Sequence, residues 1–193
     1  LRSLSLYALL PAAERAALPT AAVDAWLAAV YSVLVDGTAI TLFSILFGVG
    51  FALQMHDAQA LHAHRARFVR RMLVLLLIGI AHGLLWWGDI LRYYALLGLL
   101  LLPLARLSPV ALAALGACVA LLLPPLLQPW LPGLLPVQIS SADSAAQSLA
   151  AFSSGDWLAM LEANFERDLR MRIAVWSLPA YVFGRLLIGA ALG

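Results

Sequence analysis

Long apolar stretches constrain this chain more than any other feature. The first, residues 38–55, contains no charged side chain, and comparable stretches follow at about 72–87, 90–104, 109–127 and 173–193. A helix needs about 20 predominantly apolar residues to cross the roughly 30 Å hydrocarbon core of a bilayer. We therefore predict an all-α fold, a polytopic bundle of transmembrane helices with about five spans.

The composition favours a lipid environment over water. Of the 193 residues, 64% are hydrophobic and 11% are charged, and the mean hydropathy is +0.95. Soluble domains average about 25% charged residues, so a soluble chain of this composition would lack polar side chains for its surface. All 12 basic residues are arginine, and they form no basic face interleaved with aromatic side chains. We therefore expect the lipid bilayer as a partner and no nucleic acid.

The chain divides into two parts. Prolines and charges interrupt any span in residues 1–35, where we predict an external or interfacial segment with an amphipathic helix at 24–35. Residues 36–193 form the predicted transmembrane domain, interrupted by an external amphipathic segment at 131–172. No signal peptide is recognisable, and the last apolar stretch stops at Gly193 without a flanking charge or interfacial aromatic residue. We therefore expect a fragment, truncated at both ends.

The arginines set the predicted orientation. Segment 56–71 contains a cluster of four: Arg65, Arg67, Arg70 and Arg71. Short basic loops stay in the cytoplasm, which places Asp89 and the 131–172 segment outside and Arg106 inside. Heavy use of Ala, Leu and Arg without Lys is typical of a high-GC bacterial genome, so we predict a multi-pass protein of the bacterial cytoplasmic (inner) membrane. The cluster is also a candidate site for the phosphate of an anionic headgroup or of a nucleotide-bearing donor.

His82 and Asp89 are the leading candidates for chemistry. An ionisable group at membrane depth costs about 2.5 kcal/mol or more when charged, so it usually faces a cavity or a partner. The two residues are seven apart, about two helical turns, and share one side if the helix continues between them. A histidine organised by a carboxylate can act as a general base on a hydroxyl. Alternatively, His82 hydrogen-bonds a neighbouring helix while Asp89 caps a helix beginning at Ile90 and pairs with Arg92; spacing alone favours this second interpretation.

Other candidate ligands are weaker. His62 and His64 point to different sides of a helix, and no cysteine or carboxylate joins them, so no metal site is predicted. Cys118 is the single cysteine, which excludes disulfides and thiolate clusters, and we expect it to be buried. Arg185 in the last apolar stretch either reaches toward the interface or lines a polar path.

Two stretches carry a family resemblance. LFSILFGVGFALQ (Leu42–Gln54) and IGIAHGLLWWGDILRYYALLGLLLLP (Ile78–Pro103), with the basic segment between them, resemble the YeiB-like family of bacterial membrane proteins. That family carries a domain-of-unknown-function label. Two departures matter: the family's first span, with its D-LRG motif, and its spans after Gly193 are absent. Any site that uses those spans is incomplete here.

The resemblance also implies a chemistry, because the family is similar to membrane-embedded acyltransferases that move acyl groups onto sugars. It implies that His82 acts as base or proton relay and that Asp89 orients it or binds acceptor hydroxyls. Trp87, Arg92 and Tyr94 would contact substrate, and the arginine cluster would lie near the phosphates of a donor such as acyl-CoA. The acceptor would be a cell-envelope glycan or lipid, and no further cofactor is expected.

Two other functions are compatible with the same residues. A transporter or permease would line a polar path with His82, Asp89 and Arg185. A non-catalytic component of the cell envelope would need none of them for chemistry.

Overall fold

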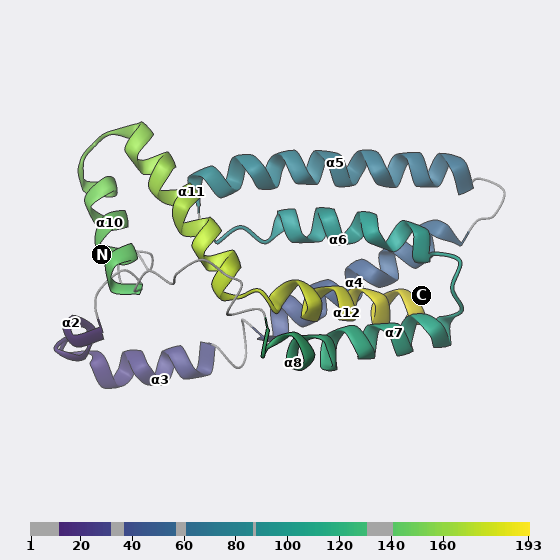
Figure 1. Ribbon diagram of the computed structural model, residues 1–193, viewed down its shortest axis with the longest axis horizontal. Helices are drawn as coiled ribbons and strands as arrows, with labels where there is room; N and C mark the ends of the chain where they lie inside the picture. The colour runs from purple at the N-terminus through teal and green to yellow at the C-terminus, as the bar shows by residue number, and fades with distance from the viewer. Residues whose placement is uncertain (1–11, 32–36, 57–60, 87, 131–140) are drawn as a thin grey trace.

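The computed structural model describes residues 12–31, 37–56, 61–86, 88–130 and 141–193, and every regular element within these ranges is helical. The predicted all-α class is confirmed for this part of the chain. Five helices run back and forth along one axis (Figure 1): α4 (Gly37–Met55), α5 (Leu61–Leu85), α6 (Leu91–Leu104), α7 (Pro109–Leu121) and α12 (Leu178–Leu192). The other helices are α2 (Ala12–Ala16), α3 (Ala21–Tyr31), α8 (Leu123–Leu127), α10 (Ser141–Ser153) and α11 (Trp157–Ala174).

Two of the described helices are long and apolar enough to cross a membrane, Gly37–Met55 and His62–Leu85. A third is reached if Trp157–Ile173 and Leu178–Leu192, which meet at a 70° bend, form one broken span. With 14 and 13 residues, α6 and α7 each rise only about 20 Å. Helices occupy all five predicted ranges, but their lengths support two or three spans rather than clearly five.

Proline chemistry explains why α7 is short. Ser108 caps its start by accepting a hydrogen bond from the Ala111 amide at 3.3 Å, and Pro109 occupies the first turn, where the missing N–H is not needed. Pro124 and Pro125 cannot donate to the helical ladder. The helix therefore breaks at Leu122 and resumes as α8.

Glycines allow α12 to pack closely between α4 and α7. A Cβ added to Gly48 of α4 would collide with the carbonyl oxygen of Leu186, and one added to Gly189 would collide with that of Ile45. On the other side, Gly184 approaches the backbone of α7 in the same way. Small residues are the usual means by which helices approach each other in membranes. They make α12 the best-buried helix of the bundle, with Val182, Leu186 and Leu187 fully inaccessible.

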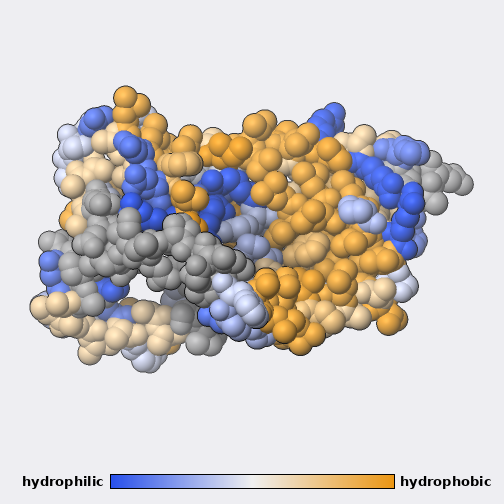
Figure 2. Space-filling view, viewed as in Figure 1, coloured by the Kyte–Doolittle hydropathy of each residue, from blue (hydrophilic) through white to orange (hydrophobic). Residues whose placement is uncertain are grey.

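The outer surface of the bundle is apolar. Only 17% of the apolar window of α4 and 22% of that of α5 is buried, and Leu77 and Leu84 of α5 are among the exposed large hydrophobic side chains. Figure 2 shows this surface as a hydrophobic band between two more hydrophilic ends. The prediction that Cys118 is buried is wrong: it lies exposed on α7, because the outer face of that helix belongs to the same apolar surface. An apolar surface of this extent indicates a lipid or protein partner.

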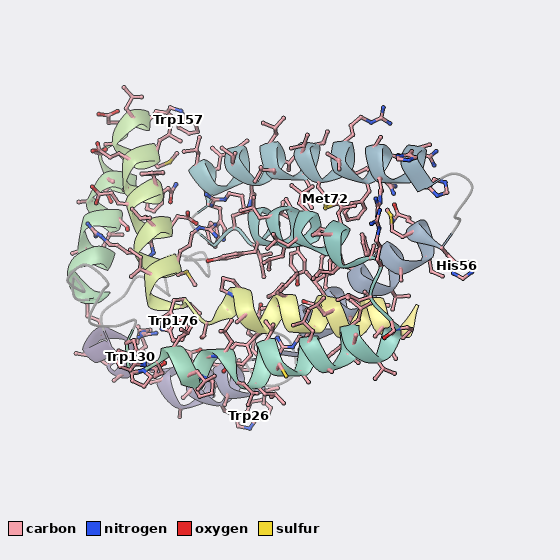
Figure 3. All side chains as sticks on the ribbon, turned by 45° about the vertical axis from the view of Figure 1, so that its right-hand side comes forward. Trp26, His56, Met72, Trp130, Trp157 and Trp176 are labelled. Atoms are coloured by element: carbon pink, nitrogen blue, oxygen red, sulfur yellow. The ribbon has the colours of Figure 1, made fainter. Side chains whose placement is uncertain are left out.

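Tryptophans mark one end of this band. Trp130 and Trp157 are 72% and 60% exposed. Together with Trp176, they lie toward the end of the bundle away from His56 (Figure 3). Exposed tryptophans are typical of the interface between a bilayer and water.

The amphipathic helix α11 has its polar face turned inward. Asp156 caps its start by accepting from the amides of Leu158 and Ala159. Asn164 and Asp168 are almost completely buried. Four apolar side chains, by contrast, are more than half exposed: Trp157, Leu158, Phe165 and Leu169. Glu162 and Glu166 are exposed beside them. The exposed apolar side chains suit a helix that faces lipid or another apolar surface.

Candidate functional site

His82 and Asp89 are in contact where α5 ends and α6 begins. The Nδ1 atom of His82 lies 3.1 Å from Oδ1 of Asp89. The two residues meet without the continuous helix that the sequence analysis assumed, because α5 ends at Leu85 and Asp89 lies back against it. The Asp89 side chain is inaccessible, whereas the His82 side chain keeps 48% of its surface exposed. The imidazole is therefore the accessible member of the pair, and it contacts a carboxylate that is itself inaccessible.

Asp89 also organises the start of α6. Its Oδ1 accepts from the Leu91 amide, and its Oδ2 accepts from the Arg92 amide, both at 3.2 Å, and from Arg92 Nε at 2.9 Å. The structure thus shows the capping and the pairing with Arg92 together with the contact to His82. Burial alone would raise the pKa of Asp89, but the hydrogen bonds from Arg92, His82 and Leu91 bring it below its ordinary value. Asp89 is therefore a carboxylate at neutral pH and acts as an acceptor.

A closed ring of four charges connects this turn to α11. Arg92 Nη2 donates to Asp168 at 2.9 Å, and Arg172 Nε donates to the other oxygen of Asp168 at 2.8 Å. Arg172 Nη2 then reaches the Asp89 carbonyl at 3.1 Å. Two carboxylates and two guanidinium groups balance each other, which is the condition under which burial of charges is tolerated. We call these residues (Asp89, Arg92, Asp168 and Arg172) the ionic ring.

Further contacts hold α11 against α5 and α6. Asn164 Nδ2 donates to the carbonyls of Leu84 and Leu85, both at 3.1 Å, and so satisfies backbone acceptors that every helix end leaves open. The guanidinium carbon of Arg172 lies 4.4 Å from the ring centroid of Tyr93, a cation–π contact. The ionic ring is therefore part of a well-defined helix junction.

Gly79 and Gly83 make room for Arg92. A Cβ on Gly79 would lie 2.9 Å from Arg92 Cγ and from its backbone nitrogen, and one on Gly83 would collide with the guanidinium group. The two glycines are one turn apart on α5, so they form a shallow channel along which the arginine reaches Asp168. Larger residues at either position would displace it.

The sequence analysis missed the α11 residues of this site. Asn164, Asp168 and Arg172 are spaced four residues apart and therefore form one polar stripe, a signal that was present in the sequence. The segment 131–172 was predicted to be an external amphipathic element, and its polar stripe was assigned no role. The structure places this stripe against the turn that contains Asp89.

The remaining predicted residues are distributed as follows. Tyr94 is 1% exposed, and its hydroxyl pairs with Ser44 Oγ at 2.8 Å and with the Ile40 carbonyl at 3.3 Å, which ties α6 to α4. Trp87 lies outside the described residues. Arg185 is half-buried on α12, and within the described ranges no hydrogen bond or ion pair joins it to His82 or Asp89. The polar path of the transporter hypothesis is thus not assembled by direct contacts.

The arginine cluster lies at the other end of α5. Arg65, Arg67, Arg70 and Arg71 belong to its first turns, so the prediction of a loop over 56–71 is wrong from Leu61 onward; residues 57–60 lie outside the described part. The reason is Phe68, which is 2% exposed and packs edge-on against Phe51, with ring centroids 5.1 Å apart. Arg71 and His82 are 11 residues apart on one helix, a rise of about 16 Å.

Fold and site together define a helical protein with at least two helices able to cross a membrane and a buried ionic ring at one end. Over 72 residues it is 44% identical to the uncharacterized protein YxaH of Bacillus subtilis, covering 36% of this chain and 18% of that protein. Over 87 residues it is 41% identical to the uncharacterized protein YeiB of Escherichia coli, covering 45% of this chain and 21% of that protein.

These similarities show distant homology to the YeiB and YxaH proteins, and they span only about a fifth of each relative's length. No family model and no solved structure matches the chain. The relatives are uncharacterized, so they assign no activity and give no support to a similarity with acyltransferases. Within the described residues, no group of three or more His, Cys, Asp or Glu side chains could hold a metal ion.

Proposed function

We propose that this chain is part of a multi-pass protein of the bacterial inner membrane in which His82 acts as general base in acyl transfer to a hydroxyl of a cell-envelope glycan or lipid. The observation that carries the proposal is the contact between His82 Nδ1 and Asp89 Oδ1 at 3.1 Å, with the imidazole half-exposed. In this proposal the shorter helices complete the membrane bundle, and the arginine end of α5 is cytoplasmic.

The contact fixes the proton on the imidazole. An ionised Asp89 accepts only, so Nδ1 carries the proton and Nε2 is left as the basic nitrogen. In the proposed reaction, Nε2 takes the proton of the acceptor hydroxyl while the hydroxyl oxygen attacks the carbonyl carbon of a thioester donor such as acyl-CoA. The carbon–sulfur bond breaks, and the leaving thiolate takes the proton from the imidazolium. Asp89 stabilises the imidazolium while it exists.

The ionic ring supports this role by immobilising the carboxylate. Asp89 receives hydrogen bonds from three groups other than His82, so it cannot rotate away from the imidazole without breaking them. Positioning of this kind, by partners that are themselves held, is what catalytic groups require. A donor whose phosphates lay at the arginine cluster would need an extended arm of at least about 16 Å to bring its thioester to His82.

The test compares two histidines of α5 in the full-length protein. Inverted membrane vesicles containing the wild type, His82→Gln or the control His64→Gln are supplied with radiolabelled acetyl-CoA, and label in the envelope glycan and lipid fractions is counted. We expect His82→Gln to lose about 100-fold or more of the transfer, since general-base catalysis contributes roughly 10²–10⁴-fold, and His64→Gln to keep it. Undiminished transfer by a correctly inserted His82→Gln protein would rule the proposal out.

A further inference from the structure

A groove between α5 and α6 opens at the arginine end of the bundle. Arg65 of α5 and Arg106, in the turn after α6, line it together with Val69, Leu102 and Pro103. Its volume is about 490 Å³, within the range of sites that hold small molecules. The groove thus combines two cationic groups with an apolar floor.

No carboxylate within the described residues neutralises the positive charge of this groove. The six ion pairs between described residues lie on α11 or at its junction with α5 and α6, away from this groove. Neither Arg65 nor Arg106 pairs with a carboxylate in the described part of the chain. In addition, the Nε atom of Arg65 is buried without a hydrogen-bond partner, which is costly for a charged donor. An anion in the groove would neutralise the two unpaired guanidinium groups.

We infer that this groove is a binding site for an anionic phospholipid. Arg65 and Arg106 hold the lipid phosphate, because guanidinium groups donate paired hydrogen bonds to phosphate oxygens. One acyl chain lies along Val69, Leu102 and Pro103 and continues over the apolar outer surface of the bundle. Basic pockets between membrane helices are established sites for anionic headgroups. A free phosphate would leave the apolar floor exposed to water, which is why the lipid is the better occupant.

The neighbouring arginines provide a contrast. Arg71 already donates to Gln54 Oε1 at 3.0 Å, and the groove that it lines with Phe47 and Phe68 contains no second cation. Arg70 and Arg71 do line another groove together, but its volume of about 270 Å³ is smaller than the 490 Å³ of the groove at Arg65 and Arg106. Arg67 is exposed and does not line the groove between α5 and α6. The lipid site is therefore assigned to Arg65 and Arg106 specifically, and Arg67 serves as a control of equal charge.

The inference rests on the proposed membrane location but not on the acyl-transfer chemistry. The full-length protein is reconstituted in nanodiscs of phosphatidylcholine, and binding of spin-labelled phosphatidylglycerol is measured from its immobilised fraction. We expect Arg65→Gln/Arg106→Gln to weaken binding about 25-fold, since each arginine near anionic lipid contributes roughly a fivefold preference. Arg67→Gln should weaken it less than about threefold, and melting temperatures show that each variant is folded.

Two further arms identify the ligand. Val69→Phe narrows the groove and keeps both arginines, so it should reduce lipid binding while leaving the charge unchanged. Inorganic phosphate at about 10 times the lipid concentration, which would compete by mass action for a phosphate-only site, should not displace the lipid. Displacement by phosphate, or equal lipid binding by the double variant and Arg67→Gln, would overturn the inference. Failure of the protein to enter nanodiscs would refute the membrane location itself, whereas loss of acyl transfer alone would leave the lipid site standing.

Discussion

Removing Asp168 tests whether the ionic ring holds α11 to the bundle. The Asp168→Ala variant deprives Arg92 of one of its two carboxylates and leaves Arg172 with only the longer ion pair to Asp89, at 3.8 Å, so the ring acquires a net charge of +1. The side chains of Asp168, Arg92 and Arg172 are 6%, 18% and 22% exposed. The charge that remains is therefore largely shielded from water, and no other acidic side chain pairs with the ring in the described ranges.

The expected cost follows from this burial. Breaking a fully buried ion pair typically costs 3–5 kcal/mol. Because both arginines keep some exposure, we expect the lower end, about 3 kcal/mol. For a chain of this size that corresponds to a fall in melting temperature of about 6–12 °C. The matched control is Glu166→Ala, which breaks the pair of Glu166 with Arg170 at 2.8 Å on the same helix, where Glu166 is 49% exposed. An exposed pair contributes less than about 1 kcal/mol.

The assay is thermal unfolding of the full-length protein in one detergent, followed by circular dichroism. A double variant, Asp168→Ala/Arg172→Ala, removes one charge of each sign and restores neutrality. It should therefore unfold at a higher temperature than Asp168→Ala alone. With the single variant Arg172→Ala it completes a double-mutant cycle, and the departure of the double variant from the sum of the two single effects is the coupling energy of the pair. If Asp168→Ala and Glu166→Ala were equally mild, or if the double variant lost the sum of both single effects, the ring would contribute nothing as a charge network.

Two other variants test the packing and the electrostatics of the bundle. Gly48→Ala should destabilise the protein by about 1–3 kcal/mol, because its Cβ would meet the backbone of α12, whereas Gly50→Ala on the same helix should be neutral or slightly stabilising because nothing lies within 4 Å; equal melting temperatures would contradict the close packing. The folded pKa of Asp89 lies below the ordinary 3.8, so the stability that its ionised form contributes is complete above about pH 4 and is lost as the pH falls through the folded value. Asp89→Asn should therefore be less stable than the wild type at neutral pH, and this difference should shrink on acidification; a difference that is constant with pH would contradict the shift.

Hydropathy and local chemistry predicted the helical class, the helices at both ends of the basic segment, and the turn at Asp89. These features depend on short stretches of sequence: an uncharged stretch and a Gly-Asp turn. The break at Leu122 within the predicted 109–127 span was not predicted, although Pro124 and Pro125 cause it. The sequence placed His82 and Asp89 on one side of a helix, about two turns apart, but the helix ends at Leu85 and the two residues meet across the turn that follows. The Asp89 carboxylate accepts hydrogen bonds from the first amides of α6. These bonds hold it close to the end of α5, where His82 lies.

The inward polar face of α11 could not be predicted from periodicity. A repeat of four shows that polar and apolar residues occupy different faces, but not which face points to the protein. In a water-soluble protein the apolar face of a helix is buried. In a membrane protein either face can pack inward, because lipid also solvates apolar side chains. The deciding information is the complementary charge of Asp89 and Arg92 in a different segment, about 76 residues away from Asp168. Such long-range pairing is visible only once the helices are placed.

Arginines near the two ends of α5 differ in whether a carboxylate of the chain neutralises them. This difference affects how the protein would be oriented in a membrane. At the Asp89 end, Arg92 and Arg172 are neutralised by carboxylates of the chain itself, so the ionic ring carries no net charge. At the other end, Arg65 and Arg106 have no carboxylate partner among the described residues, so their charge must be balanced from outside. In the membrane location that we propose, anionic headgroups of the cytoplasmic leaflet would supply that balance. The same pair of arginines that would bind a lipid would therefore also fix the orientation of the bundle, and moving an acidic residue next to Arg65 should weaken both together.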